Sequence, residues 1–281
     1  MSKIVIITPQ IKKEGEIISK EIEAYVKKRG YEAETVFIES TEGTMELDSS
    51  VVLLIALGGD GTVLYCARAA AKLNITVLPI NLGTFGYITE IEKSEWKDAL
   101  DLYLSGKKNY SNRLMLSVSV YRKNRKVFQS FALNEAVISS SGIAKVINLT
   151  LSIDNTFAGN FRSDGMIVAT PTGSTGYSLA SGGPILDAEM RALIITPICP
   201  FALSNRPLVT GDKLVVLDIK KDQRTDIVLT VDGQVFFVLN ELDRIVVKMS
   251  NKRLKLIHSS KRNFTEVIRE KLHWSGEMKH D

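Results

Sequence analysis

Residues 53–64, LLIALGGDGTVL, determine the fold of the first part of this chain. An unbroken apolar run from Val51 to Leu57 is typical of a strand that is buried on both faces of a parallel sheet. Three glycines then surround one carboxylate, Asp60, and a helical pattern begins near Thr62. In α/β proteins such a turn binds phosphate, because glycine lets backbone amides approach the ligand and the helix N-terminus adds positive potential. We therefore expect phosphate contacts from Gly58, Gly59 and Gly61.

The residues on either side of this stretch alternate between strand and helix patterns. Apolar runs predict strands at residues 3–8, 31–37, 51–57 and 75–80. Amphipathic runs predict helices at residues 14–29 and 62–73. Continuous apolar strands separated by helices imply a parallel sheet that is covered on both faces. Residues 1–105 are therefore expected to form a Rossmann-like α/β domain.

The pattern changes after about residue 109. Short β-rich runs predict strands at residues 113–121, 127–138, 145–154, 213–219, 226–231, 235–239 and 244–249. The pair Asp232-Gly233 between two of these runs predicts a hairpin, because both residue types tolerate positive φ. We therefore expect a β-rich domain at residues 106–259, which makes the fold class α/β plus β. A helical pattern at residues 263–274 lies in a final segment, 260–281, that we expect to pack back on the first domain.

The composition argues against several classes of function. Hydrophobic residues make up 44% of the 281 residues and charged residues 24%, which is ordinary for a globular protein. Cys66 and Cys199 lack the spacing of a zinc site or a disulfide framework. The net charge of +4 accompanies a basic C-terminal segment, which we interpret as a solvated helix face rather than a nucleic-acid surface. No apolar run suits a signal peptide or a membrane span, so we expect a cytoplasmic location and no membrane partner.

Asp60 is unusual in a phosphate-binding turn, because a carboxylate beside a bound polyphosphate is electrostatically unfavourable. Two roles would justify it: accepting the proton of a hydroxyl that attacks phosphorus, or meeting a Mg²⁺ ion that the phosphates carry. Capping of the following helix is the alternative, structural role. The turn fits neither the GxGxxG nor the GxxxxGK[ST] pattern, so the known phosphate loops do not decide between these roles.

Two further segments suggest a nucleotide ligand. Residues 164–184, DGMIVATPTGSTGYSLASGGP, place hydroxyl side chains between glycines, and loops of this kind concentrate binding residues. Their hydroxyls, their backbone amides and the carboxylate of Asp164 suit the ribose, amide and phosphate groups of a nucleotide. The pair Asn134-Glu135 interrupts an apolar strand pattern. It could bind an adenine edge and a ribose diol, or it could face water on an edge strand.

Together these segments resemble the NAD kinase family. GGDGT at 58–62, NE at 134–135, DG at 164–165 and TPTGSTGYSLASGGP at 170–184 occur in the order that this family shows, over essentially the whole chain. GGDGT alone is shared with diacylglycerol and sphingosine kinases, whereas the longest run points to NAD. The resemblance implies phosphoryl transfer from ATP or polyphosphate to the 2′-hydroxyl of the adenosine ribose of NAD, giving NADP. It also implies Mg²⁺ carried by ATP and a homodimer or homotetramer.

The resemblance further implies roles for individual residues. Asp60 would be the catalytic base, and Gly61 and Thr62 would lie against phosphate. Arg68 would be the first cation after GGDGT that could bind phosphate. Asn134 and Glu135 would hold the adenosine half of NAD, and Asp164 the nicotinamide amide. The complete set of NAD-binding residues implied in this way is Asp60, Gly61, Phe85, Asn134, Glu135, Lys145, Arg162, Asp164, Thr172, Thr175, Gly176, Tyr177, Ser178, Leu179, Ala180 and Gln234.

Two alternative functions remain open at the level of sequence. A lipid kinase of the diacylglycerol type would share GGDGT but would need an apolar channel or a membrane-facing surface. A non-catalytic sensor of NAD would retain residues 164–184 but would have no need of Asp60. The sequence also leaves open the choice between ATP and polyphosphate, between NAD and NADH, and between two and four subunits.

Overall fold

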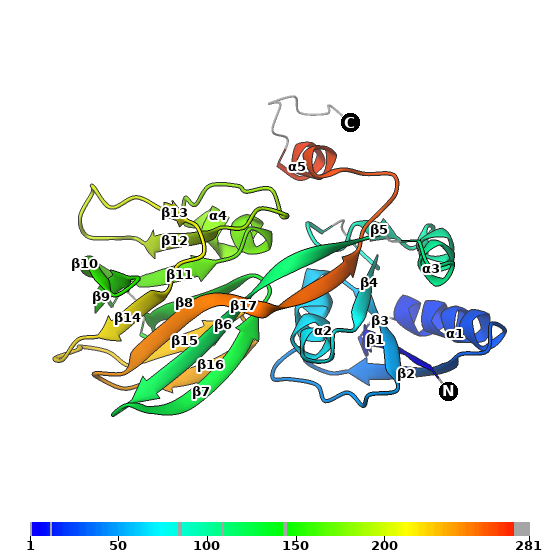
Figure 1. Ribbon diagram of the computed structural model, residues 1–281, viewed down its shortest axis with the longest axis horizontal. Helices are drawn as coiled ribbons and strands as arrows, with labels where there is room; N and C mark the ends of the chain where they lie inside the picture. Colours follow the sequence, from blue (N-terminus) through cyan, green and yellow to red (C-terminus); the bar gives the residue numbers. More distant parts are fainter. Residues whose placement is uncertain (1, 12, 84–85, 108, 143–144, 273–281) are drawn as a thin grey trace. The chain divides into compact units, whose positions relative to one another are not determined.

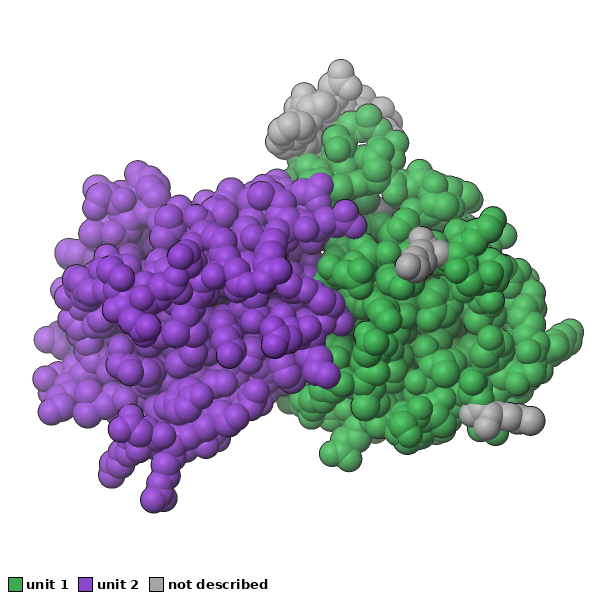
Figure 2. All heavy atoms as spheres, in the orientation of Figure 1, with its two compact units in different colours: residues 1–113, 254–281 green, residues 114–253 purple. Residues whose placement is uncertain are grey.

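The structure, a computed structural model, describes residues 2–11, 13–83, 86–107, 109–142 and 145–272. The chain forms two compact units, which Figure 2 colours separately: unit 1 comprises residues 1–113 with 254–281, and unit 2 comprises residues 114–253. Both divisions fall inside strands, because β6 (Tyr110–Arg122) and β17 (Arg244–Ile257) each contribute to both units. The expected boundaries, at residues 105–106 and 259–260, lie in the loops that flank these two strands.

Unit 1 is built on a parallel sheet with the strand order β4-β3-β1-β2 (Figure 1). Its strands are β1 (Lys3–Pro9), β2 (Glu32–Ile38), β3 (Val51–Gly58) and β4 (Thr76–Asn81). The short β5 (Ile91–Glu92) and the end of β17 also pair with β4, both in parallel. Strands β3 and β4 are almost fully buried and apolar, as a sheet covered on both faces requires. The predicted parallel α/β arrangement is confirmed.

Helices cover both faces of this sheet. They are α1 (Lys13–Lys27), α2 (Asp60–Leu73) and α3 (Trp96–Leu104). Unit 1 also contains α5 (Phe264–Leu272). Helices α1 and α3 pack Ile22 and Trp96 into one core with alternate strand residues such as Ile6 and Ile55. Figure 1 shows α2 on the opposite side of the sheet from α1. Strand β3 ends at Gly58, and the adjacent Gly59 is the N-cap of α2. The glycines of the sequence motif therefore lie at the carboxyl edge of the sheet.

The described part of the predicted C-terminal helix is α5, which buries Val267 and Ile268. Residues 273–281, which include the expected end of that helix at residue 274, lie outside the described residues. Within the described part of the chain, no helix has the length and apolar character needed to cross a membrane.

Unit 2 consists mainly of antiparallel strands, with a large apolar core and a second, smaller apolar cluster that includes Val137 and Ile167. One sheet has the order β13-β12-β11-β8-β15-β16; the other strands pair as β10-β9-β14-β17, with β6 joining β17 to β7. The elements not yet given are β7 (Arg125–Ala132), β8 (Glu135–Ser140), β9 (Ile147–Ile153), β10 (Thr156–Ser163), β11 (Gly165–Ala169), η1 (Thr172–Thr175), α4 (Tyr177–Ala180), β12 (Leu193–Ile198), β13 (Leu208–Thr210), β14 (Val215–Ile219), β15 (Ile227–Val231) and β16 (Val235–Leu239). Both sheets contribute buried side chains to the core, for example Ile138 and Leu217. The predicted β-rich second half is confirmed.

The hairpin at Asp232-Gly233 is also confirmed. Strands β15 and β16 pair antiparallel with Val231 opposite Val235, and the two turn residues have φ values of 52° and 65°. Two consecutive positive φ values match the twist of the flanking strands.

Other strand predictions need correction. The single strand expected at residues 127–138 is two strands, β7 and β8, because the chain turns at Leu133 and Asn134. Strands β10 to β13 include segments that were not predicted, since glycine and proline in residues 159–207 obscure the two-residue periodicity. Strand β17 continues to Ile257 instead of ending at residue 249, and its last residues join the sheet of unit 1.

Candidate functional site

The carboxylate of Asp60 lies in the first turn of α2 and is held by a loop of the same unit. Its Oδ2 accepts a hydrogen bond from the amide of Tyr87 at 3.0 Å. Its Oδ1 accepts from the amides of Ile88 and Thr89 at 3.2 and 3.0 Å, and from the Thr89 hydroxyl at 2.8 Å. Helix α2 has Gly59 as its N-cap and no side-chain cap bond, so capping is not the role of Asp60. The side chain instead has one fixed orientation, set by residues 87–89.

Gly86 permits this arrangement. A Cβ atom at that position would clash with Asp60 Oδ1 and with the Thr89 hydroxyl. Any larger residue would therefore displace either the carboxylate or the loop. The neighbouring residue Phe85, expected to contact NAD, lies outside the described residues.

The expected phosphate-binding glycines differ in what surrounds them. A Cβ on Gly58 would clash with the Thr62 hydroxyl, and Thr62 is only 3% exposed, so these two residues pack against each other. Gly59 has no heavy atom within 4 Å of an added Cβ, and Gly61 is exposed in the first turn of α2. Helix N-termini attract anions, and Gly59 and Gly61 are the two members of this set that are not buried.

Arg68 is buried and does not lie where a phosphate-binding side chain would be needed. Its side chain is 1% exposed, and its Nη2 donates to the carbonyl of Gly43 at 3.0 Å. A guanidinium on the buried side of α2 cannot meet a ligand at the exposed first turn of the same helix. The geometry therefore argues against the phosphate-binding role that the sequence suggested.

The second group of predicted residues lies in unit 2, around Asn134 and Glu135. The carboxylate of Asp232 accepts hydrogen bonds from the amides of Leu133, Asn134 and Glu135 at 3.0, 2.8 and 3.2 Å. The amide of Asp232 in turn donates to the Glu135 carbonyl at 2.9 Å. Asp232 is 4% exposed, so these bonds are shielded from water. They hold the turn between β7 and β8 that presents the Asn134-Glu135 pair.

The hydroxyl-rich segment packs directly on this turn. The amide of Thr170 donates to the Asn134 carbonyl at 2.8 Å, and the Thr170 hydroxyl donates to the Leu133 carbonyl at 2.5 Å. A Cβ on Gly173 would clash with the Asn134 backbone, and one on Gly176 would lie 2.8 Å from Glu135 Oε2. The two predicted motifs, NE and TGSTG, therefore form one local site.

Three polar atoms of this site are buried and have no hydrogen-bond partner among the described residues. They are Asn134 Oδ1, Glu135 Oε2 and Thr172 Oγ1. Such atoms are rare in folded proteins, because each costs about 1–3 kcal/mol of desolvation if it stays unsatisfied. Their concentration within one site indicates that a polar ligand completes their hydrogen bonding.

The electrostatics of Glu135 support the same interpretation. Burial, and next the nearby charge of Asp232, raise the pKa of Glu135 to about 8, although the backbone amide of Tyr177 opposes the shift. At neutral pH without ligand, this carboxyl is therefore mostly neutral and can donate a hydrogen bond as well as accept one. Perturbed carboxyls of this kind cluster at functional sites.

The remaining predicted residues divide into internal braces and exposed positions. Ser178 is fully buried and shares a 2.9 Å hydrogen bond with Thr196, so it supports the loop. Thr175 donates to the Thr172 carbonyl at 3.2 Å. Tyr177 and Ala180 are exposed, Leu179 and Asp164 are partly buried, and Gln234 is 7% exposed in the turn beside Asp232. Lys145 is exposed, and so is Arg162, whose guanidinium lies over the ring of Phe201 at 4.8 Å. Among the described residues, neither Lys145 nor Arg162 has a hydrogen bond or ion pair with the NE–TGSTG site.

Sequence reasoning missed the residues that hold the motifs in place. Asp232 was interpreted only as a turn residue, and Gly86, Thr89 and Thr170 were not considered as supports. The available signal was weak, because an Asp in a hairpin turn is usually exposed and only the fold reveals that this one is buried. No cluster of three or more His, Cys, Asp or Glu side chains able to hold a metal occurs among the described residues.

Comparison with known families and relatives agrees with the motifs. Residues 4–108 match the ATP-NAD kinase N-terminal domain, and residues 133–259 match the ATP-NAD kinase C-terminal domain. The NAD kinase of Treponema denticola is 44% identical over 277 residues, which cover 98% of each chain. The NAD kinase of Treponema pallidum (strain Nichols) is 33% identical over 278 residues, covering 99% of this chain and 91% of the relative.

Solved structures share the fold. Yeast NADH kinase complexed with NADH superposes with a TM-score of 0.80 at 24% identity, covering 99% of this chain and 90% of that one. An NAD kinase from Archaeoglobus fulgidus in complex with ATP gives a TM-score of 0.75 at 24% identity, covering 94% and 98%. On the strength of both matched domains and the full-length relatives, this chain belongs to the NAD kinase family of phosphotransferases.

Proposed function

We propose that this protein transfers the terminal phosphoryl group of ATP to the 2′-hydroxyl of the adenosine ribose of NAD, giving NADP and ADP. The observation that carries the proposal is the set of unpartnered buried atoms on Asn134, Glu135 and Thr172. An amide oxygen, a carboxyl and a hydroxyl suit the exocyclic amine of adenine and the hydroxyls of a ribose. The relatives named NAD kinase support NAD as the acceptor.

In the proposed reaction the ribose oxygen attacks the terminal phosphorus in line with the leaving group. The new P–O bond forms as the bond to the β-phosphate oxygen breaks, and Asp60 accepts the hydroxyl proton. Such transfers pass through a loose transition state, so the position of the carboxylate matters more than its basicity. The four hydrogen bonds from residues 87–89 supply that position. The phosphates of the donor would lie at the N-terminus of α2, beside Gly59 and Gly61.

Mg²⁺ enters this proposal as part of the Mg–ATP substrate. When bound with ATP, it would supply positive charge that neutralises the charge developing on the phosphate oxygens. Since the described residues contain no cluster suited to a metal, we assign it no protein ligands.

We also propose that the enzyme acts in the cytoplasm as a homodimer or homotetramer. Exposed apolar side chains on unit 2 support association, among them Phe236 and Val238 on the edge strand β16, which are 59% and 63% exposed. Light scattering coupled to size-exclusion chromatography measures the subunit number. A monomer at micromolar concentration would contradict the proposal.

One experiment tests the reaction and its competitors. The purified protein is incubated with Mg²⁺ and γ-labelled ATP together with NAD, NADH or diacylglycerol vesicles, and polyphosphate replaces ATP in a parallel set. We expect label in NADP in the NAD reaction and none in lipid. Label in phosphatidic acid would support a lipid kinase. Binding of NAD without labelled product would support a sensor.

A further inference from the structure

We propose that Arg262 is a positioning residue for Asp60, acting through the loop that holds the Asp60 carboxylate. The inference rests on the proposed function, in which Asp60 touches the reacting hydroxyl. It assigns a role in phosphoryl transfer to a residue of the C-terminal segment that lies outside every motif of the sequence.

Asp60 and Arg262 are connected through two adjacent residues, Thr89 and Glu90. Thr89 donates both its amide and its hydroxyl to Asp60. The next residue, Glu90, offers its backbone carbonyl to Arg262 Nη1 at 3.1 Å. Adjacent residues of one loop are thus tied to Asp60 on one side and to Arg262 on the other. Residues 89 and 90 share one planar peptide, so a displacement of Glu90 is passed on to Thr89 to the extent that the dihedral angles on either side do not absorb it.

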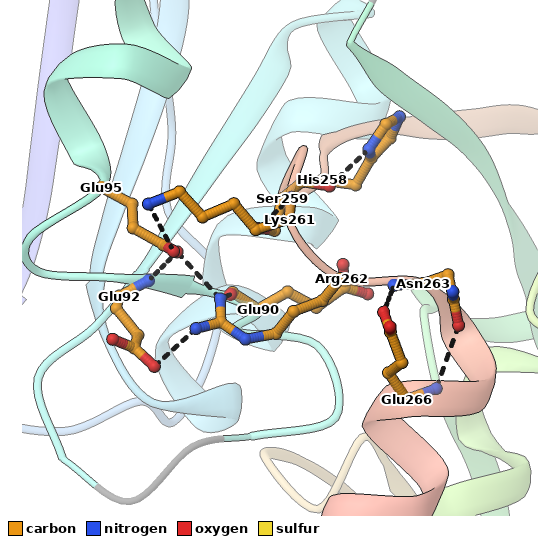
Figure 3. A network of polar contacts seen from close by, with 9 residues as sticks. All are labelled: Glu90, Glu92, Glu95, His258, Ser259, Lys261, Arg262, Asn263 and Glu266. Carbon is orange, nitrogen blue, oxygen red and sulfur yellow. Dashed lines mark hydrogen bonds and ion pairs between the residues drawn. The ribbon is translucent and has the colours of Figure 1, made fainter.

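Arg262 makes several hydrogen bonds to the segment at residues 90–95. The guanidinium of Arg262 donates from Nη2 to Glu92 Oε1 at 2.6 Å and from Nη1 to Glu95 Oε2 at 2.9 Å (Figure 3). Glu95 Oε2 also accepts the amide of Glu92 at 3.1 Å, so the loop and the arginine share one carboxylate. The side chains of Arg262 and Glu95 are 16% and 8% exposed. A partly buried, multiply bonded guanidinium holds its partners in a fixed geometry that lysine cannot reproduce.

The residues on either side of Arg262 make further contacts within unit 1. The end of β17 pairs with β4, with Lys255 opposite Thr76, and the amide of His258 donates to the Asn109 carbonyl at 3.1 Å. At the start of α5, Asn263 and Glu266 exchange hydrogen bonds between side chain and amide, at 2.9 and 3.0 Å, as Figure 3 shows. This capping box anchors the residue next to Arg262. Arg262 therefore links the loop at residues 87–92 to a segment that is held by β4 and by the start of α5.

The side chain of Glu90, in the same loop, is buried close to several positively charged side chains. Burial raises the pKa of its carboxyl, while the charges of Arg113, His258 and Arg262 oppose that effect. Loss of Arg262 would remove one of these compensating charges as well as the bond to the Glu90 carbonyl. The loop at residues 87–92 would then have fewer restraints.

The test compares Arg262→Gln and Arg262→Lys with wild type, and Arg269→Ala serves as the control because Arg269 is exposed on α5. Hydrogen–deuterium exchange of the peptide spanning residues 86–92 reports loop order without any assay of activity. We expect faster exchange there in both Arg262 variants and unchanged exchange in the control. In the NAD reaction, kcat should fall about 10-fold in the Gln variant and less in the Lys variant, since small misplacements of reacting groups have effects of this size or larger.

The affinity for NAD, measured by calorimetry, should stay within about twofold, because the residues proposed to hold adenosine lie in unit 2. A purely structural role would change kcat and affinity together, or neither. Unchanged exchange at residues 86–92, or faster exchange with unchanged kcat, would overturn the inference. If wild type itself forms no NADP, the proposed function fails, whereas the exchange result still decides whether Arg262 orders the loop.

Discussion

Asp60 and Thr89 are joined by two hydrogen bonds, one from the Thr89 amide at 3.0 Å and one from its hydroxyl at 2.8 Å, both to the same carboxylate oxygen. The two residues are 29 positions apart in sequence, and Thr89 is fully buried. Position 60 is therefore defined by a loop that follows β4 as much as by the glycine-rich turn that carries it. A carboxylate held in this way is pre-organised, which is the property that a positioned base needs.

Gly86→Ala should disturb the hydrogen bonds between Asp60 and the loop at residues 87–89. The added methyl group would overlap Asp60 Oδ1 and the Thr89 hydroxyl, so the loop or the carboxylate must shift. We expect kcat to fall about 10- to 100-fold, as misplacement of a reacting group does, with a loss of roughly 1–3 kcal/mol in the free energy of unfolding. Steady-state kinetics and denaturant unfolding measure the two effects. Gly211→Ala is the control, because its Cβ would meet no atom within 4 Å; equal losses in both variants would refute the explanation.

Asp232→Asn should weaken NAD binding more than it slows turnover. Its carboxylate accepts three backbone amides, at 2.8–3.2 Å, in the turn that presents Asn134 and Glu135. An amide group would direct its own N–H groups at some of these donors, leaving buried groups unsatisfied at about 1–3 kcal/mol each. We expect the Kd for NAD to rise about 10-fold or more by calorimetry. Asp222→Asn, in an exposed turn with a φ of 59°, should leave the Kd unchanged; an equal effect there would contradict the assignment.

Glu135 should make the stability of the ligand-free protein depend on pH. The unfolded carboxyl releases its proton near pH 4.5, whereas the folded one keeps it until about pH 8. The folded state therefore binds more protons between these values, so the contribution is complete below pH 4.5 and is lost as pH rises towards 8. The loss is at most about 5 kcal/mol.

The measurement for Glu135 is the free energy of unfolding against pH, by urea titration of wild type and of Glu135→Gln. The variant has no titrating group at this position, so its stability relative to wild type should improve steadily from pH 5 towards pH 8. Parallel curves for the two proteins would show that the carboxyl is not buried in the neutral form.

Much of the architecture could be predicted because the periodicities are local. The run from Val51 to Leu57 is apolar at every position, which only a strand covered on both faces requires, and β3 is observed there. The turn at Asp232-Gly233 follows from the conformational freedom of two residues. Strands β10 to β13 were harder, since glycine and proline interrupt their alternation and pairing with distant strands decides them.

The motifs of the candidate site could be located in the sequence, but their supports could not. Asn134 and Glu135 stand out as polar residues in an apolar run, and the structure shows that they contact the glycines at 173 and 176. Asp232 accepts hydrogen bonds from backbone amides that lie 97 to 99 positions away, and the amide of Thr89 donates to the Asp60 carboxylate 29 positions away. No local pattern reveals such contacts. The burial of Arg68 could not be predicted, because its spacing from the glycines does not say which side of α2 it occupies.

The role of Asp60 is tested most directly by Asp60→Asn, with turnover and NAD affinity measured on the same preparation. Asparagine keeps the size of the side chain and an oxygen that can accept from residues 88 and 89, although its NH2 group would face the Tyr87 amide, and it cannot take up the ribose proton. We expect kcat for NADP formation to fall about 10³-fold, within the range of a lost general base, while the Kd for NAD by calorimetry changes by less than about threefold. A variant that binds NAD normally and keeps near-wild-type kcat would contradict the assignment of Asp60 as the base.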